Sequence, residues 1–323
     1  MTEDFYALPA WAMDVLAVPG GRPGLTLRGD RLLAPDGSEA GRVDQGVVRF
    51  GLPSGDCSID FYNAVGGAHF HERSQVPLAM TTLDTPVYHS YLAKLRQGAE
   101  TGTVVDVGGG DGRNAWPLLE WGHEKVIVVE PVFAALRRLR MRVVEQHPEW
   151  LDRLLLIEAD ARNLPLLENF ADRVLSIEAL AYLNENYSIG LAECSRVLKR
   201  SGRLLVADRD YEGGLVMQML YFGGVQGLLK AGFGRDIWDG RPDMLVRSRC
   251  FTAQEFAEEF HKLDLSVVFS GGISAMSLFI SYLRSRGDEG DVTAEDITVL
   301  HRLLSKLGET GAMRRSNVVI AEK

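Results

Sequence analysis

Cysteine is scarce in this sequence, and its placement excludes two common uses. The three cysteines, Cys57, Cys194 and Cys250, are spread over 323 residues and form no CxxC pair. Zinc sites built from cysteine usually place their thiolates in closely spaced pairs, and disulfide frameworks need many cysteines in a short chain. The sequence therefore predicts no metal site and a reducing, cytoplasmic setting.

Long hydrophobic runs and an excess of positive charge are also missing. No apolar stretch approaches the ~20 residues of a membrane span, and the first twenty residues lack the basic start and apolar block of an export signal. The net charge of −9 argues against broad binding of a nucleic-acid backbone. The arginines of 133–146 lie mostly off the apolar stripe of that segment and indicate a solvated helix face. We expect neither a membrane nor a nucleic acid as partner.

Five short apolar runs alternate with helical patterns in the middle of the chain. The runs begin at Thr103, Lys125, Leu154, Arg173 and Arg203. Each ends in or near an acidic residue, in order Asp106, Glu130, Asp160, Glu178 and the pair Asp208 and Asp210. Helices are predicted over 133–146 and 188–199, the latter closed by Gly202 as a C-terminal cap. This alternation predicts βαβ units and a parallel sheet, which binds ligands at the carboxyl ends of its strands.

A glycine-rich turn follows the first of these strands. It reads D-x-G-x-G-x-G from Asp106 to Gly112. Glycines allow a sharp turn into a helix and let a ligand approach the bare backbone, and the helix start offers unpaired N–H groups. Glu130, at the tip of the next strand, is placed to accept hydrogen bonds from ribose hydroxyls. Pro117 lies inside the expected first helix and should kink it.

The turn resembles motif I of the class I S-adenosylmethionine-dependent methyltransferases. Dinucleotide dehydrogenases, the other class considered, usually begin GxGxxG directly after the strand. Three later features also resemble the methyltransferases: the pair Asp160-Ala161, the stretch RVLSIEALAYL (173–183) and the C-terminal RSNVVIAEK (315–323). The resemblance covers roughly residues 100–323. It implies an α/β fold with a doubly wound, mostly parallel seven-stranded sheet whose last strand is antiparallel.

The same resemblance implies S-adenosylmethionine as cofactor. It assigns the methionine portion to Asp106, Gly108 and Gly110, the ribose to Glu130, and the adenine to Val132, Asp160 and Ala161. Asp111 either touches the ligand or caps the helix. Glu178 either lies near the methionine amine or faces solvent.

Two segments before the core, and one insert within it, differ from the core in composition. Residues 1–60 are turn-rich and resemble the small zinc-ribbon modules of some methyltransferases, but other residues occupy the cysteine positions, so the module would have lost its metal. Residues 61–100 form a helical lead-in, with a helix expected over 86–97, and Tyr62 and Phe70 resemble lid aromatics. Residues 101–323 form the core. An insert at about 211–250 is rich in glycine, methionine and aromatic residues and predicts either a cover over a small-molecule pocket or a helical pair that completes the core or a dimer contact.

A sulfonium methyl is already electrophilic, so the acceptor must mainly be held in line and desolvated. If the acceptor is a hydroxyl, a base is needed, and His69, His71, Asp208 and Asp210 are the candidates. The apolar insert and the acidic net charge favour a small molecule of secondary metabolism as acceptor. Methylation of protein or RNA, and a non-catalytic S-adenosylmethionine-binding subunit, are the alternatives. The sequence also leaves open whether the protein forms a homodimer.

Overall fold

The computed structural model describes residues 7–53, 55–65, 83–221, 224–231, 234–241, 244–285, 294–311 and 313–323. His69, His71 and Phe70 lie outside these described residues. Within them, no helix has the length and hydropathy that would let it cross a membrane.

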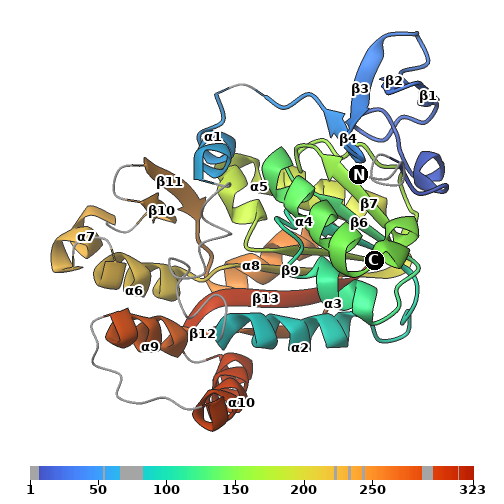
Figure 1. Cartoon of the computed structure of the whole chain (residues 1–323). Helices are drawn as coiled ribbons and strands as arrows, with labels where there is room; N and C mark the ends of the chain where they lie inside the picture. The colour runs from blue at the N-terminus through green and yellow to red at the C-terminus, as the bar shows by residue number, and fades with distance from the viewer. Residues whose placement is uncertain are drawn as a thin grey trace.

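Seven strands make the central part of the sheet (Figure 1). In spatial order they are β7 (Leu154–Glu158), β6 (Lys125–Val129), β5 (Thr103–Val107), β8 (Ala171–Ile177), β9 (Leu198–Arg209), β13 (Arg314–Glu322) and β12 (Ser266–Ser274). The pairs from β7 to β9 are parallel, whereas β13 is antiparallel to both β9 and β12. The predicted α/β class and the antiparallel last strand are confirmed.

The predicted number of seven strands is wrong, because the residues that the structure describes already contribute eleven strands to the sheet. The four additional strands are β1 (Thr26–Arg28), β2 (Arg31–Leu33), β3 (Glu39–Asp44) and β4 (Val47–Phe50). Strand β4 pairs in parallel with β7, with Val47 opposite Leu156. Without β4, the backbone N–H and C=O groups along one side of β7 would lack strand partners. The N-terminal strands are thus an extension of the core sheet, and nothing in their arrangement supports the resemblance to a zinc ribbon.

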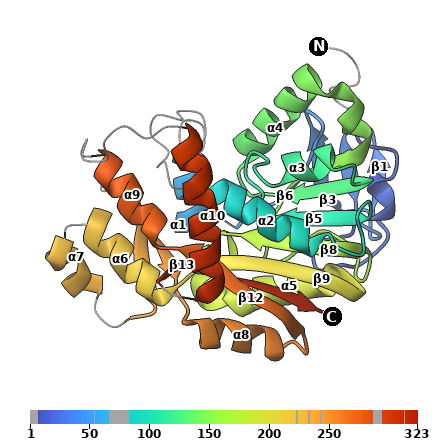
Figure 2. The ribbon, with the colours of Figure 1, turned by 90° about the horizontal axis from the view of Figure 1, so that it is seen from below.

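Helices cover both faces of the sheet (Figure 2). Helices α2 (Thr85–Leu95), α3 (Ala115–Glu120), α4 (Phe133–Gln146) and α10 (Ala294–Thr310) share one hydrophobic core with the sheet. Helices α5 (Tyr187–Val197) and α8 (Ala253–His261) share the other. Side chains alternate between the two cores along the central strand, since Val104 belongs to the first and Val105 to the second. This arrangement is the doubly wound one.

Most predicted elements are found near their expected positions. Helix α4 has the predicted bounds, and Thr252 and Glu255 form a complete capping box at the start of α8. Gly202 does not cap α5, because that helix ends at Val197 and Gly202 lies within β9. The expected kink at Pro117 does not arise, because α3 begins only at Ala115 and the proline lies in the first turn, where its missing N–H breaks no helical bond.

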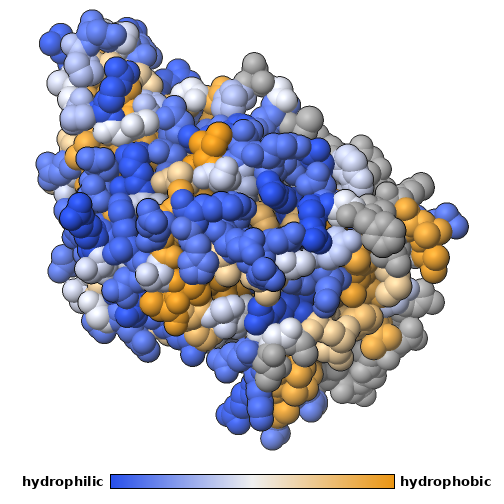
Figure 3. Space-filling view, turned by 180° about the vertical axis from the view of Figure 1, so that it is seen from behind, coloured by the Kyte–Doolittle hydropathy of each residue, from blue (hydrophilic) through white to orange (hydrophobic). Residues whose placement is uncertain are grey.

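The remaining elements lie together beyond one edge of the sheet. The insert forms helices α6 (Tyr211–Tyr221) and α7 (Gly224–Ala231) and the hairpin of β10 (Asp236–Arg241) and β11 (Met244–Arg249). Helix α6, the hairpin and α9 (Met276–Ser285) share a small hydrophobic core that contains Met217, Ile237 and Leu278. Helix α1 (Cys57–Val65) contacts β11. Seen from behind, the molecule is largely hydrophilic with several apolar patches (Figure 3). Val225 and Leu229 are exposed on α7, and Val299 and Leu303 are exposed on α10.

Candidate active site

The glycine turn after β5 requires glycine for steric reasons. Gly108 has φ = +76°, and its backbone N–H donates to the carbonyl of Val129 at 2.7 Å. A Cβ atom at this position would lie 2.2 Å from the Cβ of Ala179, in the loop after β8. Gly110 and Gly112 also have positive φ angles. The turn is therefore held between β6 and the end of β8, with its backbone close to both.

Glu130 follows β6, and its side chain contacts this turn. One carboxylate oxygen accepts from the Gly110 N–H at 3.0 Å, and the other accepts from the Val132 N–H at 3.1 Å. Burial raises the pKa of Glu130 to about 7, although the two backbone hydrogen bonds oppose the shift. A carboxylate offers about four acceptor positions, so two remain for ligand hydroxyls.

Asp106 is the buried acid on β5, and neither of its carboxylate oxygens has a hydrogen-bond partner among the described residues. Burial raises the pKa of Asp106 to about 7; Arg113 opposes the shift and Glu130 adds to it. Buried polar atoms are normally paired, so an unpartnered carboxyl beside a glycine turn is suited to a bound polar ligand. The residues present therefore fit a cofactor that carries hydroxyl and amine donors.

The residues that were predicted to contact adenine follow β6 and β7. Val132 is buried at the start of α4, and Ala161 is partly buried. Asp160 is not free in this structure, because Arg162 donates to it from both its backbone and its guanidinium. The arrangement brings Val132, Asp160 and Ala161 to the carboxyl edge of the sheet, as expected of strand ends in one parallel sheet.

Glu178 lies in a buried ionic cluster that the sequence did not predict. It has φ = +57° and accepts from Arg315 of β13, while Arg113 and Arg209 each have a nitrogen 3.9 Å from its carboxylate. Burial by itself raises the pKa of Glu178, but the three arginines outweigh it and lower the pKa to about 2. The Glu178 side chain is only 7% exposed in this cluster, so it does not extend into solvent, and its place near the methionine amine stays a prediction.

The cluster extends to helix α2 and its approach. Arg315 also lies 3.1 Å from Asp84, which is fully buried, and it donates to the hydroxyl of Tyr88 at 3.2 Å. Burial raises the pKa of Asp84 to about 6, and Arg315 opposes this shift. Asp84, Tyr88 and Arg315 carry no motif that would have marked them, because their meeting depends on pairing between distant segments.

The other predicted acids have structural contacts. Asp111 does not cap α3, since that helix has no side-chain cap. Asp208 is fully buried, accepts from the Ala181 N–H at 3.3 Å, and has a pKa that burial raises to about 8. Asp210 accepts from the N–H groups of Glu212 and Gly213 and thereby stabilises the start of α6. Its other oxygen accepts from Asn317 at 3.1 Å.

A cluster of aromatic side chains lies where α1 meets the segment after β8. Phe61 and Tyr62 of α1 meet edge to face with ring centroids 5.1 Å apart, and Tyr62 meets Tyr182 in the same way at 5.3 Å. Val246 of β11 packs against the same group. Arg209 donates to the Tyr182 hydroxyl at 3.4 Å. Helix α1, the hairpin and the ends of β8 and β9 thus form one wall, which we call the aromatic wall.

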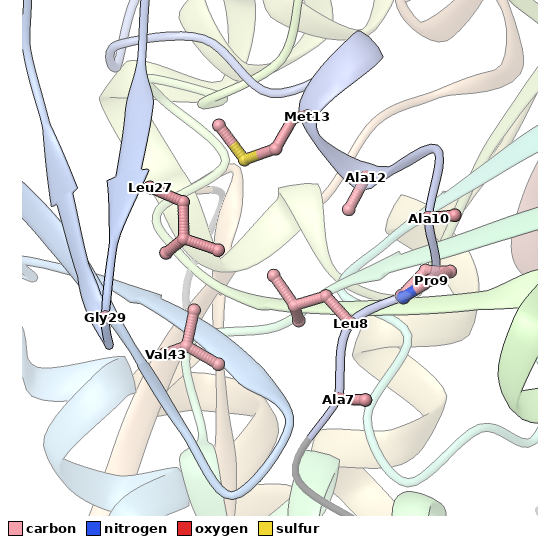
Figure 4. A pocket seen from close by; sticks show the side chains of 9 residues that line it. All are labelled: Ala7, Leu8, Pro9, Ala10, Ala12, Met13, Leu27, Gly29 and Val43. Atoms are coloured by element: carbon pink, nitrogen blue, oxygen red, sulfur yellow. The ribbon is translucent and has the colours of Figure 1, made fainter. Parts of the chain in front are cut away.

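A separate pocket of about 340 Å³ lies between the N-terminal segment and the β1–β3 strands (Figure 4). Its lining consists of alanine, leucine, proline, methionine, valine and glycine, including Leu8, Met13 and Leu27. It shares no residue with the glycine turn and carries no titratable side chain. Within the described part of the chain, no group of three or more His, Cys, Asp or Glu residues could hold a metal ion.

Comparison with known proteins gives the class of this site. Residues 105–206 match the model of a family described as a methyltransferase domain. This segment begins in β5 and ends in β9, so it contains the glycine turn, Glu130, Asp160 and Glu178. No curated protein matches the sequence.

Solved structures share the fold at low sequence identity. Magnesium protoporphyrin IX methyltransferase from Synechocystis PCC 6803 matches with a TM-score of 0.54 and 14% identity over 82% of this chain and 98% of its own. The 1,6-didemethyltoxoflavin-N1-methyltransferase of Burkholderia thailandensis matches at 0.51 and 17%, over 92% and 97%. A chain of the complex that contains the Haloferax volcanii Trm112 methyltransferase activator matches at 0.54 and 17%, over 81% and 96%. The matched domain makes the protein a methyltransferase enzyme, with S-adenosylmethionine as its cofactor.

Proposed function

We propose that the protein transfers the methyl group of S-adenosylmethionine to a small-molecule acceptor held against the aromatic wall. The observation that carries this proposal is the buried carboxyl of Asp106, which has no hydrogen-bond partner among the residues that the structure describes and lies beside Glu130 at a turn where only glycine fits. Unpartnered acceptors at the carboxyl edge of a parallel sheet suit the hydroxyl and amine donors of an adenosyl amino acid.

In this proposal the cofactor lies along the strand ends from β5 to β7. Asp106, Gly108 and Gly110 hold the methionine portion, and the remaining acceptor positions of Glu130 bind the ribose hydroxyls. Val132 and Ala161 pack against adenine, and Asp160 accepts from its exocyclic amine. Asp111 and Glu178 lie beside the methionine portion, where Glu178 stays ionised because of its arginine neighbours.

The cofactor supplies an electrophilic methyl group, so the chain has to orient the acceptor and exclude water. Within the aromatic wall, Tyr62 and Tyr182 are half-buried and therefore retain surface that an acceptor can contact. His69 and His71 remain candidate bases on the ground that imidazole titrates near neutral pH. Asp208 and Asp210 remain weaker candidates, since one is enclosed beside Ala181 and the other stabilises α6.

A small molecule is favoured over a macromolecule by the surroundings of the wall. The insert covers this edge with α6 and the hairpin, and Phe61 and Val246 are buried. A net charge of −9 also disfavours RNA. Two of the similar structures are, by their names, methyltransferases of magnesium protoporphyrin IX and 1,6-didemethyltoxoflavin. The similarity to a chain of the Trm112 complex keeps a partner-dependent methyltransferase as the second candidate.

Transfer of a labelled methyl group tests this proposal. Purified protein, methyl-labelled S-adenosylmethionine and a cell extract are incubated together, and low-mass products are separated from protein and RNA. Label in the low-mass fraction is expected. Label confined to protein or RNA would overturn the choice of acceptor.

Glu130→Ala is the matched variant for the cofactor. It should lose label transfer and weaken cofactor binding by about 1–3 kcal/mol in calorimetry, because it removes a charged hydrogen-bond acceptor. Glu124→Ala is the control, since Glu124 is exposed just before β6. Equal affinity of a folded Glu130→Ala protein and the wild type would contradict the ribose assignment.

A further inference from the structure

Arg162 connects the loop after β7 to helix α1. Its backbone N–H and its Nε donate to Asp160 Oδ1 at 2.8 and 2.9 Å, and its Nε and Nη2 donate to Asp160 Oδ2 at 2.8 and 2.5 Å. The same Nη2 donates to Asp56 Oδ2 at 2.9 Å. One guanidinium is thus shared between two carboxylates on different segments.

Both carboxylate oxygens of Asp160 are engaged by these contacts. Arg162 brings three N–H groups to them, and its single Nε–H is shared between Oδ1 and Oδ2. If Asp160 accepts from the adenine amine, as the proposed function requires, the amine competes with Arg162 for these oxygens and weakens the hold of Arg162 on Asp160. The remaining acidic partner of Arg162 is Asp56.

Asp56 fixes the beginning of α1. Its Oδ1 accepts from the backbone N–H groups of Ser58 and Ile59, at 3.0 and 3.3 Å, and from the Ser58 hydroxyl at 2.6 Å. Such a contact satisfies N–H groups that the first turn of a helix leaves unpaired. A stronger bond from Arg162 to Asp56 would therefore hold the whole start of α1 against the sheet.

The middle of α1 carries part of the aromatic wall. Tyr62 meets Tyr182, in the segment after β8, and Phe61 packs with Val246 of the hairpin. In Figure 1, α1 lies between the hairpin of β10 and β11 and the end of the sheet at which β4 and β7 are found. The helix thus joins the adenine side of the site to the acceptor side.

We propose that Arg162 is a positioning residue that couples the two halves of the site. Binding of adenine to Asp160 shifts Arg162 toward Asp56, which secures α1 and the aromatic wall, so that the cofactor binds before the acceptor. This inference rests on the proposed function, specifically on the adenine contact of Asp160. The proposed role of Arg162 is an effect on helix α1 that appears when the cofactor binds, in addition to its structural contacts.

Hydrogen exchange with and without S-adenosylhomocysteine tests the coupling. In the wild-type protein the compound should slow exchange both in the glycine turn, 108–113, and in α1. In Arg162→Gln the glycine turn should still be protected, whereas the added protection of α1 should be lost. Arg203→Gln is the control, because Arg203 pairs with Glu322 elsewhere on the sheet.

A second variant separates coupling from general damage to the loop. Asp56→Asn keeps an oxygen to cap α1 but removes the charge that attracts Arg162, and it should show the same selective loss. Equal protection of α1 in the wild type, Arg162→Gln and Asp56→Asn would overturn the coupling. Absence of protection in the wild-type glycine turn would instead refute the proposed cofactor site.

Discussion

At the scale of single residues, the site is defined by buried carboxyl groups for which the described part of the chain provides no ion pair. Asp106 and Glu130 both have pKa values that burial raises to about 7. An acid whose pKa is raised on folding favours the folded state at low pH, and this contribution is lost as the pH rises through 7. Ionisation of these two acids at neutral pH therefore lowers the stability of the ligand-free protein.

This cost predicts how Asp106→Asn behaves. The variant keeps the shape of the side chain but cannot ionise, so its Tm without cofactor should exceed that of the wild type at pH 8, with a smaller difference near pH 4. The increase with S-adenosylmethionine should be smaller in the variant, because the cofactor pairs with the ionised acid. In the wild type, cofactor affinity should fall as the pH falls below 7. Thermal shift and calorimetry across this range measure both effects, and a wild-type affinity independent of pH would contradict the argument.

At the scale of secondary-structure elements, the N-terminal strands matter because β4 brings Arg49 to the carboxyl end of β7. Arg49 binds Glu158, the last residue of β7, and Asp44 of β3, and its guanidinium lies 3.9 Å from the ring centroid of Phe133 at the start of α4. Phe133 directly follows Val132, the predicted adenine contact. The N-terminal extension is therefore joined through one side chain to the edge of the sheet at which we propose that the cofactor binds.

Replacement of Arg49 by Met should lower the free energy of unfolding by about 1–3 kcal/mol, because Glu158 is left as a buried charge without its partner. Urea denaturation measures the change. Arg31→Met is the matched control, since the Arg31–Glu39 pair is largely exposed and should contribute less than about 0.5 kcal/mol. Similar losses in both variants would show that β4 is not fixed through Arg49.

The elements also show what local sequence can and cannot predict. The strand runs, the bounds of α4 and the capping box of α8 were predictable, because apolar periodicity and capping residues act over a few positions. The pairing of β4 with β7 was not, since the four-residue run VVRF carries no information about a partner more than a hundred residues away. Gly202 was wrongly predicted to cap a helix for the same reason. Glycine can cap a helix, but here strand β9, which pairs with β13, continues through this residue.

At the scale of the whole molecule, the three acids proposed to bind the cofactor and the arginine cluster around Glu178 differ in how well the sequence predicts them. Asp106 lies near the end of β5, and Glu130 and Asp160 follow β6 and β7, so their shared edge of the sheet was predictable from the alternation of elements. The cluster around Glu178 was not, because Arg315 lies 137 residues further along the chain and reaches it only through the antiparallel insertion of β13. This cluster joins β8, β9, β13 and the approach to α2.

Removal of Arg315 should therefore affect global stability. Arg315→Met leaves Asp84 and Glu178 as buried carboxylates without their main partner, and should lower the free energy of unfolding by about 3–5 kcal/mol. Because the folded pKa of Glu178 is lowered to about 2, its pairing stabilises the protein above the ordinary glutamate pKa near 4.5 and is lost as the pH falls toward 2. The difference between the wild type and the variant should accordingly be largest at neutral pH and shrink in acid. Chemical denaturation at several pH values measures it, with Arg314→Met as the neighbouring control, since Arg314 is only partly buried. A difference that stays constant down to pH 3 would mean that Arg315 stabilises the fold by packing instead of by its charge.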